Sequence, residues 1–120
     1  MKKKLLIVED DADIANNLKV LLEEEGYRVH IAQNGKLALD ILRTAHCLPS
    51  LILLDLMMPI MDGFEFRREQ LSDPKLASIR VVIMSADGHV AEKLAITSAD
   101  AYLTKPFEME KIINVVELLS

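Results

Sequence analysis

The most constraining feature of this sequence is a set of short apolar runs that end abruptly at polar residues. Residues 5–8 (LLIV), 51–54 (LILL) and 81–84 (VVIM) form these runs. Each run is short for a buried helix, and its leucine and β-branched content is typical of a strand covered on both faces. Such strands occur in parallel sheets with helices packed above and below, so the runs predict an α/β fold.

Amphipathic stretches separate the apolar runs. After the first run, Ile14, Leu18 and Leu22 recur at helical spacing, with Asp11 or Asp13 as the capping residue. Similar patterns predict helices that begin near residues 35, 64, 90 and 108, and two more strands at residues 27–31 and 101–104. Right-handed crossovers leave few topologies for such a chain. We therefore expect a flavodoxin-like (βα)5 doubly wound parallel sheet with strand order 2-1-3-4-5.

Length and composition limit the possible function classes. The 120 residues suit a single domain, and we expect residues 1–120 to form one unit. A net charge of −5 provides no basic footprint for nucleic acid. One cysteine, Cys47, excludes an intrachain disulfide, and no apolar stretch approaches the length of a membrane span. These features favour a soluble cytoplasmic protein with no membrane partner.

Polar side chains follow four of the predicted strands at their carboxyl ends. Glu9 and Asp10 follow the first run, Asp55 the third strand, Ser85 the fourth and Lys105 the fifth. The carboxyl ends of parallel strands meet at one edge of the sheet, where ligands of such folds bind. Clustered carboxylates repel one another and favour a hard cation such as Mg²⁺. A lysine and a hydroxyl suit phosphoryl oxygens, so the set predicts phosphoryl transfer with Asp55 as nucleophile.

Four stretches then give the chain a family resemblance. Residues 5–11 (LLIVEDD), 53–63 (LLDLMMPIMDG), 84–86 (MSA) and 102–107 (YLTKPF) resemble the signature stretches of response-regulator receiver domains of two-component systems. They occur in the family's order across the whole chain. The resemblance implies a signalling switch that is activated by phosphorylation and accepts a phosphoryl group from a histidine kinase or a phosphotransfer protein.

The resemblance also implies where the phosphoryl group and the metal ion bind. Asp55 is the expected phosphoacceptor, forming an aspartyl phosphate. Asp10 and Asp55 are expected to bind Mg²⁺ together with the main-chain oxygen of Met57, and Glu9 is expected to help through water. Tuning of dephosphorylation is expected at two positions, Met57 and Asp87.

Other residues are expected to sense the phosphoryl group. By the same resemblance, Lys105 pairs with it, Ser85 donates a hydrogen bond to it, and the Ala86 main-chain amide lies beside it. Tyr102 matches the aromatic residue that swings inward when Ser85 moves, and Lys105–Pro106 matches a cis peptide. The fourth helix, fifth strand and fifth helix together form the expected output face.

Two function classes stay open at this point. The favoured one is the phosphorylation-driven switch, which is not an enzyme with an external substrate but assists its own phosphorylation and dephosphorylation. The alternative is a receiver-like module that binds a protein partner without phosphorylation. The sequence also leaves open whether the chain is a stand-alone protein or a domain of a longer regulator, and which kinase and output partner it uses.

Three sets of residues receive ordinary structural interpretations. Arg67 and Arg68 are expected on a solvated helix face, and Cys47 as a small, half-buried apolar residue. The histidines are scattered along the chain, so we expect surface positions for His30, His46 and His89.

Overall fold

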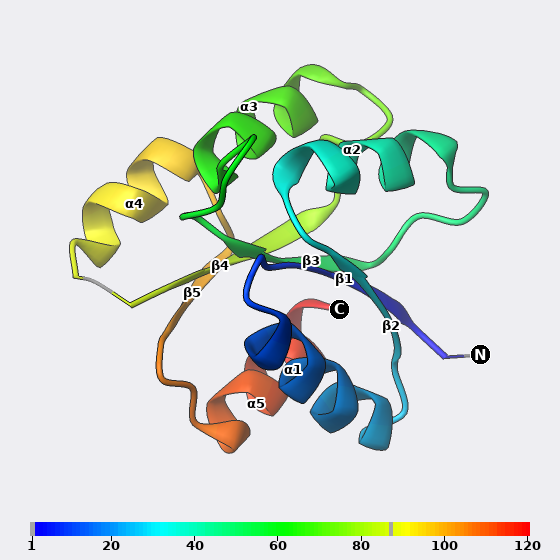
Figure 1. Cartoon of the computed structure of the whole chain (residues 1–120), viewed down its shortest axis with the longest axis vertical. Coiled ribbons are helices and arrows are strands. Elements are labelled where there is room, and N and C mark those ends of the chain that lie inside the picture. The colour runs from blue at the N-terminus through cyan, green and yellow to red at the C-terminus, as the bar shows by residue number, and fades with distance from the viewer. Residues whose placement is uncertain (1, 87) are drawn as a thin grey trace.

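The computed structural model describes residues 2–86 and 88–120, in which five strands alternate with five helices (Figure 1). The strands are β1 (Lys4–Val8), β2 (Arg28–Ala32), β3 (Leu51–Asp55), β4 (Arg80–Ser85) and β5 (Ala101–Thr104). The helices are α1 (Ala12–Glu24), α2 (Gly35–Thr44), α3 (Gly63–Ser72), α4 (Val90–Thr97) and α5 (Met109–Leu119). All paired strands are parallel, in the order β2-β1-β3-β4-β5, which confirms the predicted fold.

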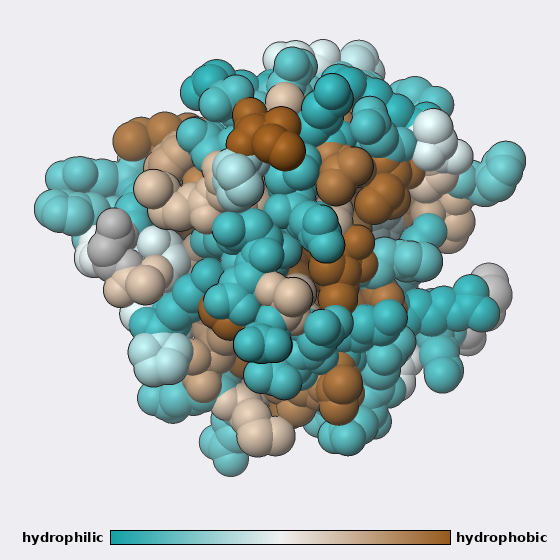
Figure 2. All heavy atoms as spheres, in the orientation of Figure 1, coloured by the Kyte–Doolittle hydropathy of each residue, from teal (hydrophilic) through white to brown (hydrophobic). Residues whose placement is uncertain are grey.

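Helices cover the sheet on both faces. Figure 1 shows α1 and α5 below the sheet and α2, α3 and α4 above it. Alternate residues of each strand point to opposite faces, so β1 gives Leu6 and Val8 to one apolar cluster and Leu5 and Ile7 to the other. On the face in Figure 2, apolar residues lie in patches among hydrophilic ones. In the described part of the chain, no helix is long and apolar enough to cross a membrane.

Side-chain caps fix where three helices begin. Asp11 caps α1 by accepting hydrogen bonds from the main-chain amides of Asp13 and Ile14, at 3.0 and 3.2 Å. Asn34 and Asp62 cap α2 and α3 in the same way. Of the two predicted caps for α1, the structure uses Asp11. Three residues thus separate β1 from α1, and residues 9 and 10 stay in this connecting loop at the sheet edge.

Arg67 lies in the interior, and the prediction of a solvated face was wrong for this residue. It is 6% exposed, and its guanidinium donates hydrogen bonds to the main-chain oxygens of Thr97 and Ser98 and to the Gln70 side chain, at 2.8, 2.9 and 2.8 Å. Burial lowers its pKa, and the charge of Asp100 opposes that shift. The last carbonyls of a helix lack partners within the helix, so α3 supplies donors to the end of α4.

Gly63 allows α3 to pack directly against the end of β3. A Cβ atom at this position would lie 2.5 Å from the Asp55 main-chain oxygen and 2.7 Å from the Leu56 Cα atom. The Gly63 amide also donates a 3.0 Å hydrogen bond to the Leu56 main-chain oxygen. The backbone that carries Asp55 is therefore held in place by a contact that only glycine permits.

Gly63→Ala is expected to destabilise the fold by about 1–3 kcal/mol, because the added Cβ would overlap backbone atoms of Asp55 and Leu56. The β3–α3 connection would have to shift to make room for it. Urea unfolding of the two proteins measures the difference. Gly88→Ala is the matched control, since a Cβ at Gly88 meets nothing within 4 Å. Equal midpoints for Gly63→Ala and Gly88→Ala would contradict the packing argument.

Arg67→Met is expected to lower the free energy of unfolding by about 2–3 kcal/mol, because it leaves buried carbonyl groups and the Gln70 side chain without their donors. Arg68→Met, at the exposed neighbouring position, is expected to change stability by at most about 0.5 kcal/mol. Thermal or urea unfolding compares the two. A similar small effect for both would show that the guanidinium does not hold α4.

Candidate functional site

Three carboxylates converge at the carboxyl edge of the sheet. β1 and β3 are neighbours with Val8 opposite Leu54, so Glu9 and Asp10 emerge beside Asp55, the last residue of β3. One oxygen from each carboxylate lies within 4.8 Å of the others. Glu9 and Asp55 are 1% and 4% exposed, whereas Asp10 is exposed. The fold thus brings together three acids that the sequence placed at two separate strand ends.

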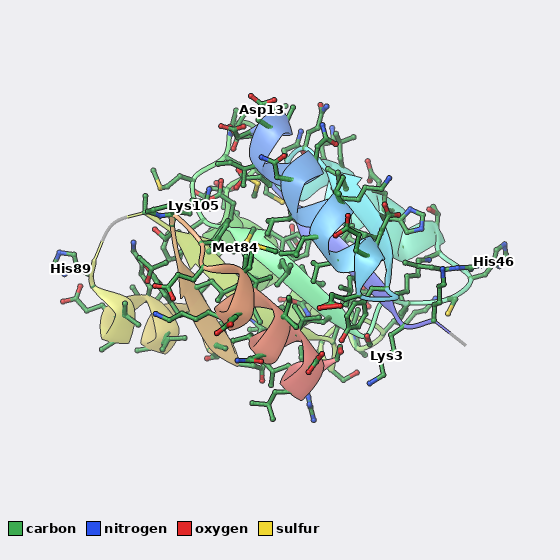
Figure 3. All side chains as sticks on the ribbon, turned by 90° about the horizontal axis from the view of Figure 1, so that it is seen from below. Lys3, Asp13, His46, Met84, His89 and Lys105 are labelled. Atoms are coloured by element: carbon green, nitrogen blue, oxygen red, sulfur yellow. The ribbon has the colours of Figure 1, made fainter. Side chains whose placement is uncertain are left out.

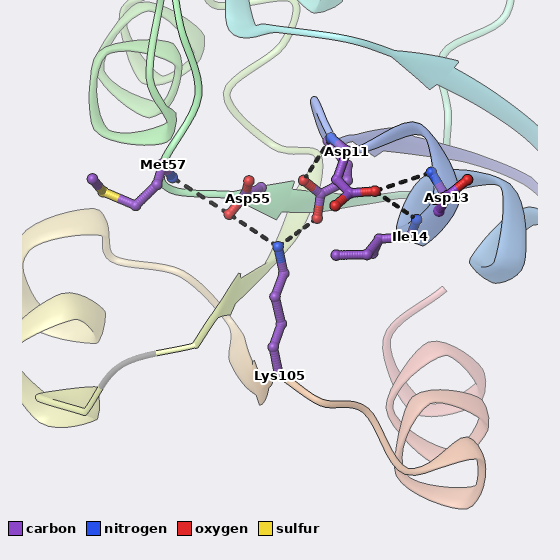
Figure 4. A network of polar contacts seen from close by, with 7 residues as sticks. Asp11, Asp13, Ile14, Asp55, Met57 and Lys105 are labelled. Atoms are coloured by element: carbon purple, nitrogen blue, oxygen red, sulfur yellow. Dashed lines mark hydrogen bonds and ion pairs between the residues drawn. The ribbon is translucent and has the colours of Figure 1, made fainter.

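Lys105 provides a positive charge to this cluster. It follows β5, and its Nζ atom lies 2.5 Å from Glu9 Oε1 and 3.5 Å from Asp55 Oδ1 (Figure 4). Its main-chain amide donates a 2.9 Å hydrogen bond to the Ser85 main-chain oxygen, which extends the pairing of β4 and β5. The peptide bond between Lys105 and Pro106 is cis, as the resemblance implied. Lys105 therefore reaches across β4 to the acids at the ends of β1 and β3.

Two main-chain amides orient the buried carboxylates. The Asp11 amide lies 3.3 Å from Glu9 Oε2, and the Met57 amide lies 3.4 Å from Asp55 Oδ1. Figure 4 shows both contacts beside the capping bonds that Asp11 makes at the start of α1. The loops that follow β1 and β3 therefore hold these two side chains toward Lys105.

The charges of the site shift the pKa values of its buried groups. Burial raises the pKa of Glu9 to about 7, the hydrogen bond from Lys105 opposes the shift, and Asp55 adds to it. Burial alone would lower the pKa of Lys105, but its contacts with Glu9 and Asp55 outweigh that effect and raise it. A single lysine cannot neutralise three carboxylates, so the cluster favours a further cation.

Glu9, Asp10 and Asp55 form a donor set that fits Mg²⁺. Carboxylate oxygens are hard ligands, and Mg²⁺ in proteins is commonly held by one or two carboxylates with water and phosphate oxygens completing its coordination. The three oxygens are close enough to share one ion, and the exposed Asp10 leaves one side of the cluster open to solvent. The structure therefore supports this acidic cluster as a candidate metal site.

Ser85 lies at the next strand end and is bonded to a residue that the sequence analysis did not predict. It ends β4, is 3% exposed, and follows Met84, which pairs with Asp55 across β3 and β4. The Lys93 ammonium of α4 donates a 2.9 Å hydrogen bond to Ser85 Oγ. Ala86 follows and is exposed. No pattern in the sequence links Lys93 to Ser85, because their contact depends on how α4 packs against the end of β4.

The remaining predicted site residues have varied positions. Tyr102 of β5 is half-buried and packs against the apolar cluster that also contacts Leu94 of α4. The Met57 side chain is 71% exposed. Asp87 lies outside the described residues. The roles predicted for Tyr102, Met57 and Asp87 therefore remain predictions.

Residues outside the site partly match their predicted settings. All three histidines are exposed, and Figure 3 places His46 and His89 at opposite sides of the molecule. Cys47 is also exposed, so the expected half-buried position was wrong. It lies in the connection between α2 and β3, which provides too little packing to cover it.

The arrangement of the site agrees with a comparison to known families. The family model described as the response regulator receiver domain matches residues 5–117. The chain belongs to this family. As a receiver domain of two-component response regulators, it is a switch activated by phosphorylation.

Individual relatives are similar over nearly the whole receiver domain. The chain is 33% identical over 118 residues to the response regulator Rre1 of Synechocystis sp.. This alignment covers 96% of the chain and 50% of Rre1. The chain spans about half the length of the curated relatives it matches.

Solved receiver structures have the same fold. The receiver domain of a signal transduction histidine kinase from Syntrophus aciditrophicus has a TM-score of 0.88 and 33% identity, with 98% of this chain and 89% of that chain covered. The response regulator TrrA from Thermotoga maritima, solved in complex with Mg²⁺-BeF, has a TM-score of 0.86 and 30% identity, covering 98% and 99%.

Magnesium is expected to stabilise this receiver domain, and more strongly at pH 8 than at pH 6. A group whose pKa is raised to about 7 in the folded state must lose its proton before it attracts a cation, and the Glu9 carboxyl is such a group. In the metal-free chain, the same shift makes Glu9 lower the stability as pH rises through about 5 to 7. Magnesium at ten times its dissociation constant adds about 1.4 kcal/mol, or roughly 5 °C in Tm.

Thermal unfolding with Mg²⁺ or EDTA at the two pH values measures this effect. Asp10→Asn is expected to remove most of the Mg²⁺-dependent shift, whereas Asp13→Asn, on the exposed first turn of α1, is expected to keep it. An equal shift in both variants would mean that the ion binds elsewhere.

Proposed function

We propose that Asp55 is the phosphoacceptor of this receiver domain and that its donor is the phosphohistidine of a histidine kinase or of a phosphotransfer protein. The observation that supports this most directly is the setting of its carboxylate. Asp55 lies at the carboxyl edge of the sheet, 3.5 Å from the Lys105 ammonium and in a cluster with two other acids. A carboxylate placed beside a fixed cation is suited to attack phosphorus.

In the proposed transfer, a carboxylate oxygen of Asp55 attacks phosphorus in line with the leaving nitrogen. A P–O bond forms, the P–N bond of the donor breaks, and the imidazole leaves with the electron pair. Asp10, Asp55 and the Met57 main-chain oxygen are the proposed Mg²⁺ ligands, with Glu9 acting through water. When bound, Mg²⁺ supplies positive charge close to the phosphoryl oxygens.

Three further groups are proposed to bind the product. Lys105 pairs with a phosphoryl oxygen, the Ser85 hydroxyl donates a hydrogen bond to another, and the Ala86 amide lies beside them. The phosphoryl group carries about 1.5–2 negative charges in place of the single charge of the carboxylate, and its oxygens attract the lysine and the hydroxyl. The domain thereby assists its own phosphorylation and dephosphorylation without an external substrate. Met57 and Asp87 are the proposed positions that tune dephosphorylation.

The output follows from movement of Ser85 and repacking of Tyr102. Tyr102 lies in β5 against the cluster that contacts α4, so a shift of this ring changes the surface made by α4, β5 and α5. We propose that this face binds an output protein or a further domain of the full regulator. Residues 1–120 act as one receiver unit in this proposal, with the cytoplasm as its expected location.

A receiver-like module that binds a partner without phosphorylation is the alternative. Glu9, Asp10, Asp55, Ser85 and Lys105 are all present, and four of these side chains are in mutual contact or in one acidic cluster. A module that had lost the chemistry would not need to retain the complete set, so the switch is the better supported function.

Incubation with acetyl phosphate and Mg²⁺ is expected to add one phosphoryl group to the chain. Asp55→Asn is expected to abolish the adduct, and Asp40→Asn, at an exposed position of α2, is expected to leave it intact. Intact-mass spectrometry measures the product, and loss of the adduct in hydroxylamine identifies an acyl phosphate. If the wild-type chain forms no adduct under conditions that phosphorylate an active receiver, the binding-module alternative replaces the switch.

A further inference from the structure

Helix α4 is attached to the rest of the fold at each end by a basic side chain. At its carboxyl end, Arg67 of α3 donates hydrogen bonds to the main-chain oxygens of Thr97 and Ser98. In its first turn, Lys93 of α4 itself donates to Ser85 Oγ at 2.9 Å. Thr97 is the buried residue of this helix and Leu94 packs half-buried against the core, so few apolar side chains hold the helix in position. The contact between Lys93 and Ser85 is therefore a main attachment of the amino-terminal half of α4 to the sheet.

The chemistry of this contact determines the orientation of the serine. An ammonium group only donates, so Lys93 occupies a lone pair of the Ser85 hydroxyl. Hydrogen bonds with a charged partner are stronger than neutral ones, and this one lies at a strand end where Ser85 is 3% exposed. A serine side chain occupies one of three staggered rotamers. The lysine therefore favours the rotamer that directs Oγ toward α4.

The two lysines near the strand ends serve different groups. Lys105 Nζ pairs with the carboxylates of Glu9 and Asp55, whereas Lys93 Nζ bonds to the Ser85 hydroxyl. The proposed role of Ser85 requires its hydroxyl to turn toward a phosphoryl group on Asp55. The Lys93 ammonium bonds to Ser85 from α4, so in that state the hydroxyl leaves the lysine.

We propose that Lys93 is a latch on Ser85. In the unphosphorylated domain it holds the hydroxyl toward α4, and this contact breaks when Ser85 binds the phosphoryl group. The inference rests on the proposed roles of Asp55 and Ser85 and adds a positioning residue to them. A contact made only in the resting state opposes the phosphorylated state by the free energy of that contact. Release of the latch also frees the first turn of α4, which connects the chemistry to the output face.

The test measures binding of beryllofluoride, with Mg²⁺ present, as a probe for the phosphoryl group. Lys93→Met keeps the apolar stem and removes the ammonium group, and it is expected to lower the apparent Kd about three- to tenfold, the worth of one net hydrogen bond. Lys93→Arg is expected to restore an affinity close to wild type. Lys111→Met, at an exposed lysine on α5, is the matched control for loss of one positive charge and is expected to leave the Kd unchanged.

A double-mutant cycle distinguishes a latch from a general structural effect. Without the hydroxyl there is nothing to hold, so Lys93→Met is expected to have no effect on beryllofluoride affinity in a Ser85→Ala background. Titrations followed by amide NMR give each Kd, and circular dichroism verifies that every variant is folded. If Lys93→Met fails to fold, Lys93→Gln takes its place in the cycle.

The outcomes separate this inference from the proposed function. An unchanged or weaker affinity in Lys93→Met overturns the latch, and so does an equal gain in the Ser85→Ala background. In either case, wild-type binding of beryllofluoride and phosphorylation at Asp55 would leave the proposed function intact. If the wild-type chain neither binds the probe nor takes a phosphoryl group from acetyl phosphate, both the proposed function and the latch are overturned.

Discussion

Electrostatic repulsion among three carboxylates at one sheet edge is the constraint on which the rest of this structure depends. The pairing of β1 with β3 forces Glu9, Asp10 and Asp55 together, with oxygens within 4.8 Å of one another. Lys105 and two main-chain amides compensate part of that charge. The remaining negative charge makes the site receptive to a cation, and this is the electrostatic condition under which a metal-assisted phosphoryl transfer can operate.

The fold divides into a firmly packed sheet and a less firmly held helix. The strands β1, β3 and β4 are almost completely buried, and they fix the positions of the acidic side chains and Ser85 at the candidate site. Helix α4 has one buried residue and is attached largely through polar contacts. Hydrogen bonds can be exchanged for others at small net cost, whereas a packed core cannot be rearranged piecemeal. A domain built in this way can change one surface without disturbing its site.

The sequence was sufficient for the features that depend on local order along the chain. Apolar runs that stop at polar residues predicted the strands and the edge where Asp55 and Lys105 meet, because a parallel sheet aligns all its carboxyl ends. Features that depend on contacts between distant elements were missed. Arg67 was expected to face solvent, but it donates a hydrogen bond to a carbonyl group at the end of α4. The sequence did not predict the contact between Lys93 and Ser85, because this contact depends on how α4 packs against the sheet. A charged residue on a helix has the same appearance in the sequence whether it faces water or a carbonyl group.

The guanidinium contacts of Arg67 hold the carboxyl end of α4 and determine which part of the helix can move. An element of eight residues is about 12 Å long, and after the proposed release of Lys93 it would pivot at its carboxyl end, which Arg67 holds. Displacement in the proposed switch would grow with distance from this end and be greatest at Val90. A protein that contacts the helix near Thr97 would experience almost the same surface in both states. A protein that contacts the first turn would instead experience the largest difference, so discrimination between the two states is concentrated at that end of the helix.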